Sequence, residues 1–245
     1  MQVLKIYIKE SPLRNFNYII YSEVNKNAIF VDPLDINVTM PIVKEKGLKP
    51  RYLINTHYHP DHKHHNEKLL SEYPSVEEIT FEDKKEFSLS ETEKIEAIYT
   101  PGHLDPHYVF KLYNNDEPFG VITGDVLFNC GIGNARQGDV NVLYETISQK
   151  IMQLEDHLIV YPAHDYLVTN LKFAQTVEKE NQHRDQLLEK EMKIDNEVTY
   201  HSVDHTIEDE KKINPFLRLN ELKTEYPNKN EKEIFLHLRK QRDNW

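Results

Sequence analysis

Cysteine and long apolar runs are what this sequence most lacks. The 245-residue chain has a single cysteine, Cys130, so it forms no internal disulfide, and a reducing, cytoplasmic compartment is expected. It contains no apolar run of about 18 residues, which predicts that no helix crosses a membrane. The stretch MQVLKIYIKE carries charges within its apolar part and no small-residue cleavage site, so we expect no signal peptide.

Positive charge is also in short supply. The chain has 30 Lys and Arg against 41 Asp and Glu, which gives a net charge of −11. Such a surface repels phosphate backbones and anionic lipid heads, so neither nucleic acid nor a membrane is an expected partner. The hydrophobic fraction of 38% is still enough for a core. The length fits one large domain, or one domain with a small appendage.

Short apolar runs separated by turns fill the first two thirds of the chain. They predict strands at 3–8, 17–22, 28–33, 51–55, 94–100, 119–124 and 157–162. Residues 25–27 are expected to form a hairpin turn, and a helix is expected over 36–47, where Gly47 is suited to end it. Strands that alternate with helices indicate an α/β layered domain.

The composition shifts after residue 168, so we expect one α/β domain over 1–168 and a small helical domain over 169–245. Leu171, Ala174 and Val177 have helical spacing, with Thr169 or Asn170 suited to cap that helix. A second amphipathic helix is predicted over 230–242. The charged stretch 188–212 is interpreted as a solvated helix face and loop.

Histidine, in contrast, is abundant and clustered. The chain has 13 histidines, and five of them lie in the segment NTHYHPDHKHHN at 55–66. Strands of an open α/β sheet bind ligands beyond their carboxyl ends, and four predicted strands are each followed by His or Asp there. These candidate ligands are His57, His59, Asp61, His62, His103, Asp125 and His164. The other histidines considered, His157, His183, His201, His205 and His237, are expected not to bind metal.

Imidazole and carboxylate ligands suit divalent Zn, Mn or Fe. Seven ligands are too many for one tetrahedral ion, and they suit two ions that share a bridging carboxylate. Covalent catalysis is disfavoured, because the chain has no Gly-x-Ser-x-Gly motif and Cys130 has no defined base partner.

Four motifs in order, THYHPDH, TPGH, TGD and YPAHD, resemble the metallo-β-lactamase superfamily over about residues 1–170. This resemblance implies an αββα sandwich with two metal ions at one edge. It implies that His57, His59 and His103 bind the first ion, and that Asp61, His62 and His164 bind the second. Asp125 would bridge the two.

Within that superfamily the sequence most resembles glyoxalase II, the hydroxyacylglutathione hydrolase, through NEKLL, AHDYLVTNLKFAQTVEKEN and NPFLR. The resemblance implies hydrolysis of an S-acylglutathione such as S-lactoylglutathione by attack of a metal-bridging hydroxide. Asp61 and Asp125 would be the catalytic carboxylates. Tyr166, Arg218 and Lys223 would contact the glutathione part, and no oligomeric state is predicted.

The sequence departs from that family around the expected substrate pocket. His64 and His65 stand where the family has two glycines. In CGIGNARQGD, Ile132 and Asn134 lie near places that the family fills with a basic and an aromatic residue, and Arg136 is close by. The metal site is therefore expected to be intact and the pocket altered.

Three alternatives stay open at this point. YPAHDY and LYETI also resemble the persulfide dioxygenases, which use a single iron and oxygen, although the long helical tail argues against them. A lactone or another ester is a second possible substrate for the same hydrolytic fold. A third alternative is a metal-binding protein without turnover or a nucleic-acid-processing relative, which the net charge and the complete ligand set disfavour.

Overall fold

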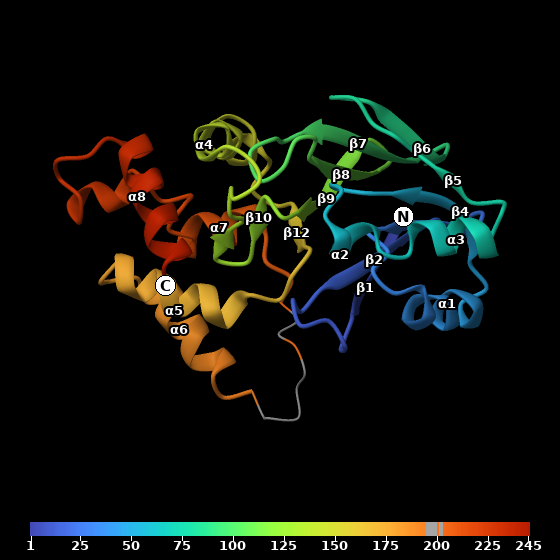
Figure 1. Cartoon of the computed structure of the whole chain (residues 1–245), viewed down its shortest axis with the longest axis horizontal. Helices are drawn as coiled ribbons and strands as arrows, with labels where there is room; N and C mark the ends of the chain where they lie inside the picture. The colour runs from blue at the N-terminus through green and yellow to red at the C-terminus, as the bar shows by residue number, and fades with distance from the viewer. Residues whose placement is uncertain (195–199, 201–202) are drawn as a thin grey trace.

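Two β-sheets form the centre of the computed structural model, which describes residues 1–194, 200 and 203–245 (Figure 1). The first sheet has the order β1-β2-β3-β4-β5 and the second has the order β12-β9-β8-β7-β6. The strands of the first sheet are β1 (Gln2–Tyr7), β2 (Phe16–Tyr21), β3 (Asn27–Val31), β4 (Lys49–Ile54) and β5 (Glu77–Glu78). Those of the second are β6 (Glu86–Ser90), β7 (Glu93–Tyr99), β8 (Tyr108–Asn114), β9 (Glu117–Gly124) and β12 (Ile159–Pro162).

Helices and a small hairpin complete the described part of the chain. The hairpin pairs β10 (Leu127–Phe128) with β11 (Gly131–Ile132). The α-helices are α1 (Ile36–Glu45), α2 (Pro60–Lys63), α3 (Asn66–Glu72), α4 (Val140–Gln149), α5 (Leu167–Val177), α6 (Gln182–Glu191), α7 (Ile207–Ile213) and α8 (Glu231–Asp243). Two 3₁₀ turns are η1 (Ile151–Gln153) and η2 (Glu221–Thr224).

Three apolar cores separate four layers, so the expected αββα sandwich is confirmed. Alternate side chains of β2 point to opposite faces of the first sheet: Ile20 packs between the two sheets, while Ile19 packs under the helices α1 and α3. On the far side of the second sheet, Val121 packs with Leu143 of α4. Strands buried on both faces must be apolar along their whole length, which is why the sequence shows them as continuous runs.

The carboxyl-terminal helices share a core with the second sheet. Phe216 and Phe235 belong to the same buried cluster as Val109 and Val121, and Figure 1 shows α5 to α8 gathered beyond that sheet. The division at 168/169 stays a prediction, since it falls within the first turn of α5. The expected cap of that helix is wrong: α5 begins at Leu167, and the Asn170 side chain instead donates to the Asn129 carbonyl.

All seven predicted strands are present, with ends that differ by a few residues. The predicted helix at 36–47 corresponds to α1, which Asp35 caps and which Gly47 follows with a φ of +62°. Strand β8 was missed because Lys111 interrupts its apolar pattern, and β5, β6, β10 and β11 were missed as well. Part of the charged stretch 188–212, including His201, lies outside the described residues. Among the helices that are described, none is both long and apolar enough to cross a bilayer.

Candidate metal centre

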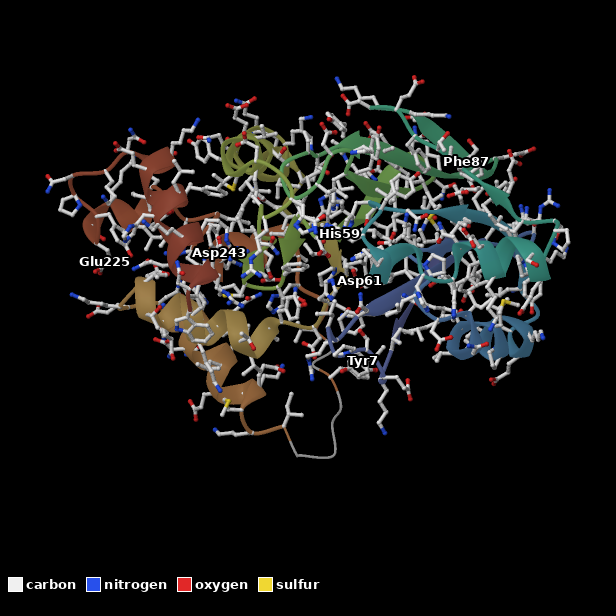
Figure 2. The ribbon with its side chains drawn as sticks, in the orientation of Figure 1. Tyr7, His59, Asp61, Phe87, Glu225 and Asp243 are labelled. Carbon is white, nitrogen blue, oxygen red and sulfur yellow. The ribbon has the colours of Figure 1, made fainter. Side chains whose placement is uncertain are left out.

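The candidate ligands converge because the strands that deliver them end at one edge. Strands β7, β9 and β12 run in the same direction, since β8 is antiparallel to both β7 and β9, and β12 is parallel to β9. Their carboxyl ends deliver His103, Asp125 and His164, while β4 of the facing sheet leads into the segment 57–62. Figure 2 shows His59 and Asp61 near the middle of the molecule, where the strands meet the helical part.

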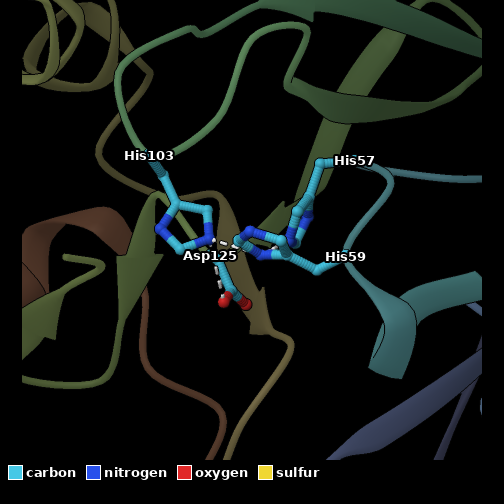
Figure 3. Close-up of side chains that lie close together, drawn as sticks. All are labelled: His57, His59, His103 and Asp125. Atoms are coloured by element: carbon cyan, nitrogen blue, oxygen red, sulfur yellow. Dashed lines mark hydrogen bonds and ion pairs between the residues drawn. The ribbon is translucent and has the colours of Figure 1, made fainter. Parts of the chain in front are cut away.

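The first group consists of His57, His59, His103 and Asp125 (Figure 3). The Nδ1 atom of His59 lies 2.9 Å from His57 Nε2 and 3.1 Å from His103 Nε2. One carboxylate oxygen of Asp125, Oδ2, lies 3.4 Å from His103 Nε2. Three nitrogens and an oxygen therefore face a common point.

The second group consists of Asp61, His62 and His164. The Oδ2 atom of Asp61 lies 3.4 Å from His62 Nε2 and 3.5 Å from His164 Nε2. The other oxygen of Asp125, Oδ1, lies 3.1 Å from His164 Nε2 and 3.4 Å from His62 Nε2. Asp125 thus presents one oxygen to each group, and the structure brings all seven predicted ligands together in the expected grouping.

Hydrogen bonds on the outer side of each imidazole fix its tautomer. The Nδ1–H groups of His103 and His164 donate to the carbonyls of Asn134 and Leu13, at 2.7 and 2.8 Å. His62 Nδ1 lies 2.9 Å from the Asp32 carboxylate. In each case the outer nitrogen must carry the hydrogen, because its partner only accepts. In the neutral ring the inner nitrogen therefore keeps its lone pair.

His57 and His59 follow the same rule. Thr56 Oγ1 donates to Asp32 Oδ2 at 2.7 Å and so accepts from His57 Nδ1 at 3.0 Å. His59 Nε2 donates to Gln137 Oε1 at 3.2 Å. When their rings are neutral, the five histidines thus direct five lone pairs inward beside two carboxylates, which is the donor set that a divalent cation satisfies.

Buried polar atoms and the pKa values of the histidines also indicate that the site accommodates a cation. His62 Nε2 and Asp125 Oδ1 are buried side-chain atoms with no hydrogen-bond partner. Burial lowers the pKa values of His57 and His103, which keeps both rings neutral. Burial would also lower the pKa of His62, but the Asp125 and Asp32 carboxylates raise it well above its usual range, so this ring holds a second proton that a divalent cation would displace. The chain's own residues therefore fit a cationic group between them.

Two supporting residues were missed from the sequence. Asp32 accepts from Thr56 N–H at 2.8 Å as well as from the Thr56 hydroxyl and His62, so it fixes two ligand-bearing segments. His107 is fully buried, stacks on His57 at 5.0 Å and accepts from Asp125 N–H at 3.2 Å. Asp32 directly follows β3, and this position at a strand end could have identified it from the sequence. His107 precedes β8, so its position did not mark it as a site residue.

The three residues predicted to contact the substrate, Tyr166, Arg218 and Lys223, have different neighbours. Tyr166 stacks on His164, with ring centroids 5.0 Å apart and planes 3° apart. Arg218 instead pairs with Glu178 at 2.9 Å, and Lys223 pairs with Glu231 at 2.8 Å. The role of all three in substrate binding stays a prediction, and only Tyr166 is seen in contact with a candidate ligand.

Other histidines have structural partners. His65 Nδ1 accepts from Ile36 N–H at 3.0 Å at the start of α1, and its ring lies 4.9 Å from that of His64. His205 pairs with Glu210 at 2.8 Å, and His157 donates to the Pro118 carbonyl. Within the described part of the chain, the candidate metal groups contain none of His157, His183, His205 and His237.

The loop that departs from the family pattern packs directly on the ligands. A Cβ atom at Gly133 would lie 1.9 Å from the Asp125 carbonyl oxygen and 3.0 Å from His103 Nδ1. The following residues supply the Asn134 carbonyl to His103 and the Gln137 amide to His59. This loop therefore positions two ligands, while Arg136 at its tip is exposed.

Comparison with known proteins identifies relatives over the full length of the chain. Residues 165–245 match the family model described as "Hydroxyacylglutathione hydrolase C-terminus". A hydroxyacylglutathione hydrolase of Polaromonas sp. is 32% identical, and the match covers 95% of each chain. One of Francisella philomiragia is also 32% identical, over the whole of both chains.

Solved structures support the fold alone. ETHE1 from Myxococcus xanthus superposes with a TM-score of 0.69 at 22% identity, over 98% of this chain and 90% of that one. A metallo-β-lactamase from Staphylococcus aureus superposes with a TM-score of 0.68 at 17% identity, over 97% and 66%. Together with the full-length relatives and the converging histidines and aspartates, these findings show that the chain belongs to the hydroxyacylglutathione hydrolase family of metal-dependent thioester hydrolases.

Proposed function

We propose that this protein hydrolyses the thioester bond of an S-acylglutathione, such as S-lactoylglutathione, at a centre that holds two divalent ions. Zinc, iron and manganese all suit a site of imidazoles and carboxylates. His57, His59 and His103 would hold one ion, Asp61, His62 and His164 the other, and Asp125 both. We also propose a cytoplasmic location, which the single buried cysteine supports.

The observation that carries this proposal is the position of Asp125. Its Oδ2 faces the first group and its Oδ1 faces the second, each within 3.1–3.4 Å of imidazole nitrogens. Burial would raise the pKa of Asp125, but His164 and His62 lower it well below the usual range. The carboxylate is therefore ionised and can serve both groups at once.

Bound divalent ions would lower the pKa of water toward neutrality, to about 7 in favourable zinc sites, and would polarise a carbonyl. The reaction adds water across the thioester: a C–O bond forms, the C–S bond breaks, and the thiolate leaves and is protonated. Asn15 Nδ2 donates to Asp61 Oδ2 at 2.9 Å and fixes that carboxylate. With 22% of its side chain exposed, Asp61 can accept a hydrogen from the attacking water and orient it.

Tyr166 and nearby arginines are suited to the glutathione part. Burial, followed by the Asp125 and Asp61 charges, raises the pKa of Tyr166 well above its usual range, while Arg242 and Arg14 oppose this shift. The hydroxyl therefore stays protonated and can donate a hydrogen bond. Arg14, which pairs with Asp165 but keeps 39% of its side chain exposed, and Arg242, which donates to Asn170, lie on this side, so we propose them as partners for a substrate carboxylate.

Thiol release from S-lactoylglutathione tests the proposed function. The protein is first loaded with zinc, and its metal content is measured by mass spectrometry. We expect about two ions per chain and fast thiol release, both sharply reduced in His59→Ala and Asp125→Ala. The matched control is His183→Ala, because His183 is an exposed histidine on α6.

A fully metalled protein that released no thiol from any acylglutathione would overturn the proposed substrate. The persulfide dioxygenase alternative rests on the motifs YPAHDY and LYETI alone. Oxygen uptake with glutathione persulfide, measured on the iron-loaded protein, separates that alternative from hydrolysis.

A further inference from the structure

A pocket of about 470 Å³ opens directly beside the metal-ligand candidate Asp61. The loop between β1 and β2 forms one wall, and the start of α1 forms another. His64 and His65, which follow α2, close the third side. Its volume lies in the range of small-ligand sites and is larger than a short hydroxyacyl group needs.

The lining is apolar and acidic apart from His64 and His65, and it contains neither lysine nor arginine. Ile8, Pro12, Leu13 and Leu34 supply the apolar surface, and nearly half of the Leu13 side chain is exposed there, 46%. Glu10 and Asp35 supply carboxylates that lie outside the metal-ligand groups, whereas the charge of Asp61 would be offset by a bound ion. An anionic group would be repelled from this pocket, whereas an uncharged apolar group would bury surface in it.

The walls are tied to the metal centre by hydrogen bonds. The Leu13 carbonyl accepts from His164 Nδ1 at 2.8 Å, and Asn15 of the same loop donates to Asp61 at 2.9 Å. On the opposite wall, His65 Nδ1 accepts from Ile36 N–H at 3.0 Å. The pocket is therefore built into the same framework as the second group of ligands, and its position relative to that group is fixed.

The glutathione part of a substrate fits a different side of the centre. Glutathione carries carboxylates, and two arginines lie on the side of Tyr166: Arg14, which pairs with Asp165 and keeps 39% of its side chain exposed, and Arg242, which donates to Asn170 of α5. Tyr166, Arg14 and Asp165 line a separate small pocket. With the carboxylates held there, the acyl side of the thioester is left to extend past Asp61 toward Leu13.

We infer that the pocket beside Asp61 is an acyl subsite that favours uncharged acyl groups longer than lactoyl and excludes acyl groups that end in a carboxylate. This inference rests on the proposed function, because it assigns a place to the acyl group of the same thioester. The Glu10 and Asp35 carboxylates disfavour an anion, and the pocket adjoins Asp61, so an uncharged acyl group is the occupant that fits.

The first test is a series of acylglutathiones with the zinc-loaded protein. We expect kcat/KM to rise about threefold to fourfold for each methylene buried, from acetyl through butanoyl to hexanoyl. Succinylglutathione is expected to react at least tenfold more slowly than pentanoylglutathione, about 1.4 kcal/mol in kcat/KM. A kcat/KM that is independent of acyl length and charge would overturn the inference.

Two variants place the effect in this pocket. Leu13→Ala is expected to lower the hexanoyl-to-acetyl ratio of kcat/KM severalfold, and Glu10→Lys to raise the succinyl-to-pentanoyl ratio severalfold. The matched controls make the same changes elsewhere: Val24→Ala at the exposed β2–β3 turn, and Glu67→Lys on the exposed side of α3. If these kcat/KM ratios shift as much in the control variants as in Leu13→Ala and Glu10→Lys, the inference is also overturned.

Binding of thioethers separates this inference from the proposed function, because thioethers are not hydrolysed. Calorimetry should show that S-hexylglutathione binds at least tenfold more tightly than S-methylglutathione, and that Leu13→Ala removes most of this difference. Hexyl preference without any thioester turnover would leave the subsite standing and overturn the hydrolase. Turnover with equal binding of both thioethers would overturn the subsite alone.

Discussion

At the scale of single residues, the site depends on partners that never face the substrate. Asp32 is buried and accepts from Thr56 N–H, the Thr56 hydroxyl and His62, at 2.7–2.9 Å. These bonds connect it to the segment that bears His57 and to the ligand His62. Its contribution is therefore to hold ligands in place rather than to bind an ion.

Replacing Asp32 by Ala should weaken metal binding without removing a candidate ligand. His62 would lose the carboxylate that fixes its tautomer, and loss of such an outer partner typically lowers metal affinity about 10- to 100-fold. Competition with a chromophoric chelator measures this affinity. Asp116→Ala, at the exposed turn between β8 and β9, is the control. Equal affinities in both variants would show that Asp32 plays no such role.

The seven candidate ligands could be found from the sequence because each lies just beyond a strand end, within a short motif. Their supporting residues could not be found in the same way. Asn15 and Gln137 are ordinary loop residues in sequence, and only the folded chain brings them to Asp61 and His59. Arg218 was predicted from its motif to bind substrate, and this role stays a prediction, since the structure shows only its pair with Glu178.

At the scale of elements, α7 is anchored to the β10–β11 hairpin by one buried carboxylate. Glu210 accepts from Cys130 N–H at 2.7 Å and from the Asn214 side chain at 3.1 Å. Its other oxygen accepts from the Asn129 side chain at 3.3 Å and lies 2.8 Å from His205 Nδ1. The hairpin directly follows Asp125, so this contact links the helical part to the site.

We expect Glu210→Ala to destabilise the protein by about 3–5 kcal/mol, because it would leave several buried donors without an acceptor. Chemical denaturation followed by circular dichroism gives this value. The control is Glu208→Ala on the same helix, which removes only an exposed pair with Lys212 and should change stability by less than about 0.5 kcal/mol. A small effect in both variants would contradict this account of α7.

Elements with a continuous apolar run or a clear end signal could be predicted, and elements with a broken pattern could not. The apolar run 119–124 predicted β9, and Gly47 predicted the end of α1. Strand β8 has Lys111 in its middle and was overlooked. The start of α5 was misplaced because Asn170, a good capping residue, serves a tertiary hydrogen bond to Asn129 inside the helix.

At the scale of the whole molecule, the metal centre lies where both sheets meet, so its occupancy should affect global stability. Ions that bind only the folded chain stabilise it by about 2.7 kcal/mol at a hundred times their dissociation constant. We expect a chelator to lower the melting temperature by about 5–10 °C. Calorimetry of the His183→Ala control should show the same shift, and Asp125→Ala should show much less. An unchanged melting temperature in the parent protein would contradict a bound metal.

The shared core also predicts how the chain unfolds. Because Phe216 and Phe235 pack in one cluster with Val109 and Val121, the helical part and the second sheet should unfold together. The single tryptophan, Trp245, contacts Phe173 and reports on the helices by fluorescence. Its transition should coincide with that of far-ultraviolet circular dichroism. Two separate transitions would instead favour independent domains.

The overall architecture was predictable because the motifs and the strand runs gave the same answer. What the sequence left open was how the two parts are joined, since the cluster that contains Phe216 and Val109 unites segments far apart in the chain. Such contacts depend on shape complementarity between elements, which neither apolar periodicity nor local motifs encode.

The enclosure of Cys130 has a consequence for a protein whose proposed product is itself a thiol. Its Sγ is buried, donates to the Ile213 carbonyl at 3.3 Å and has a pKa that burial raises well above the usual range. Disulfide exchange requires an accessible thiolate. The folded chain should therefore keep its unmodified mass in oxidised glutathione, and it should gain a glutathionyl adduct only when α7 separates from the hairpin.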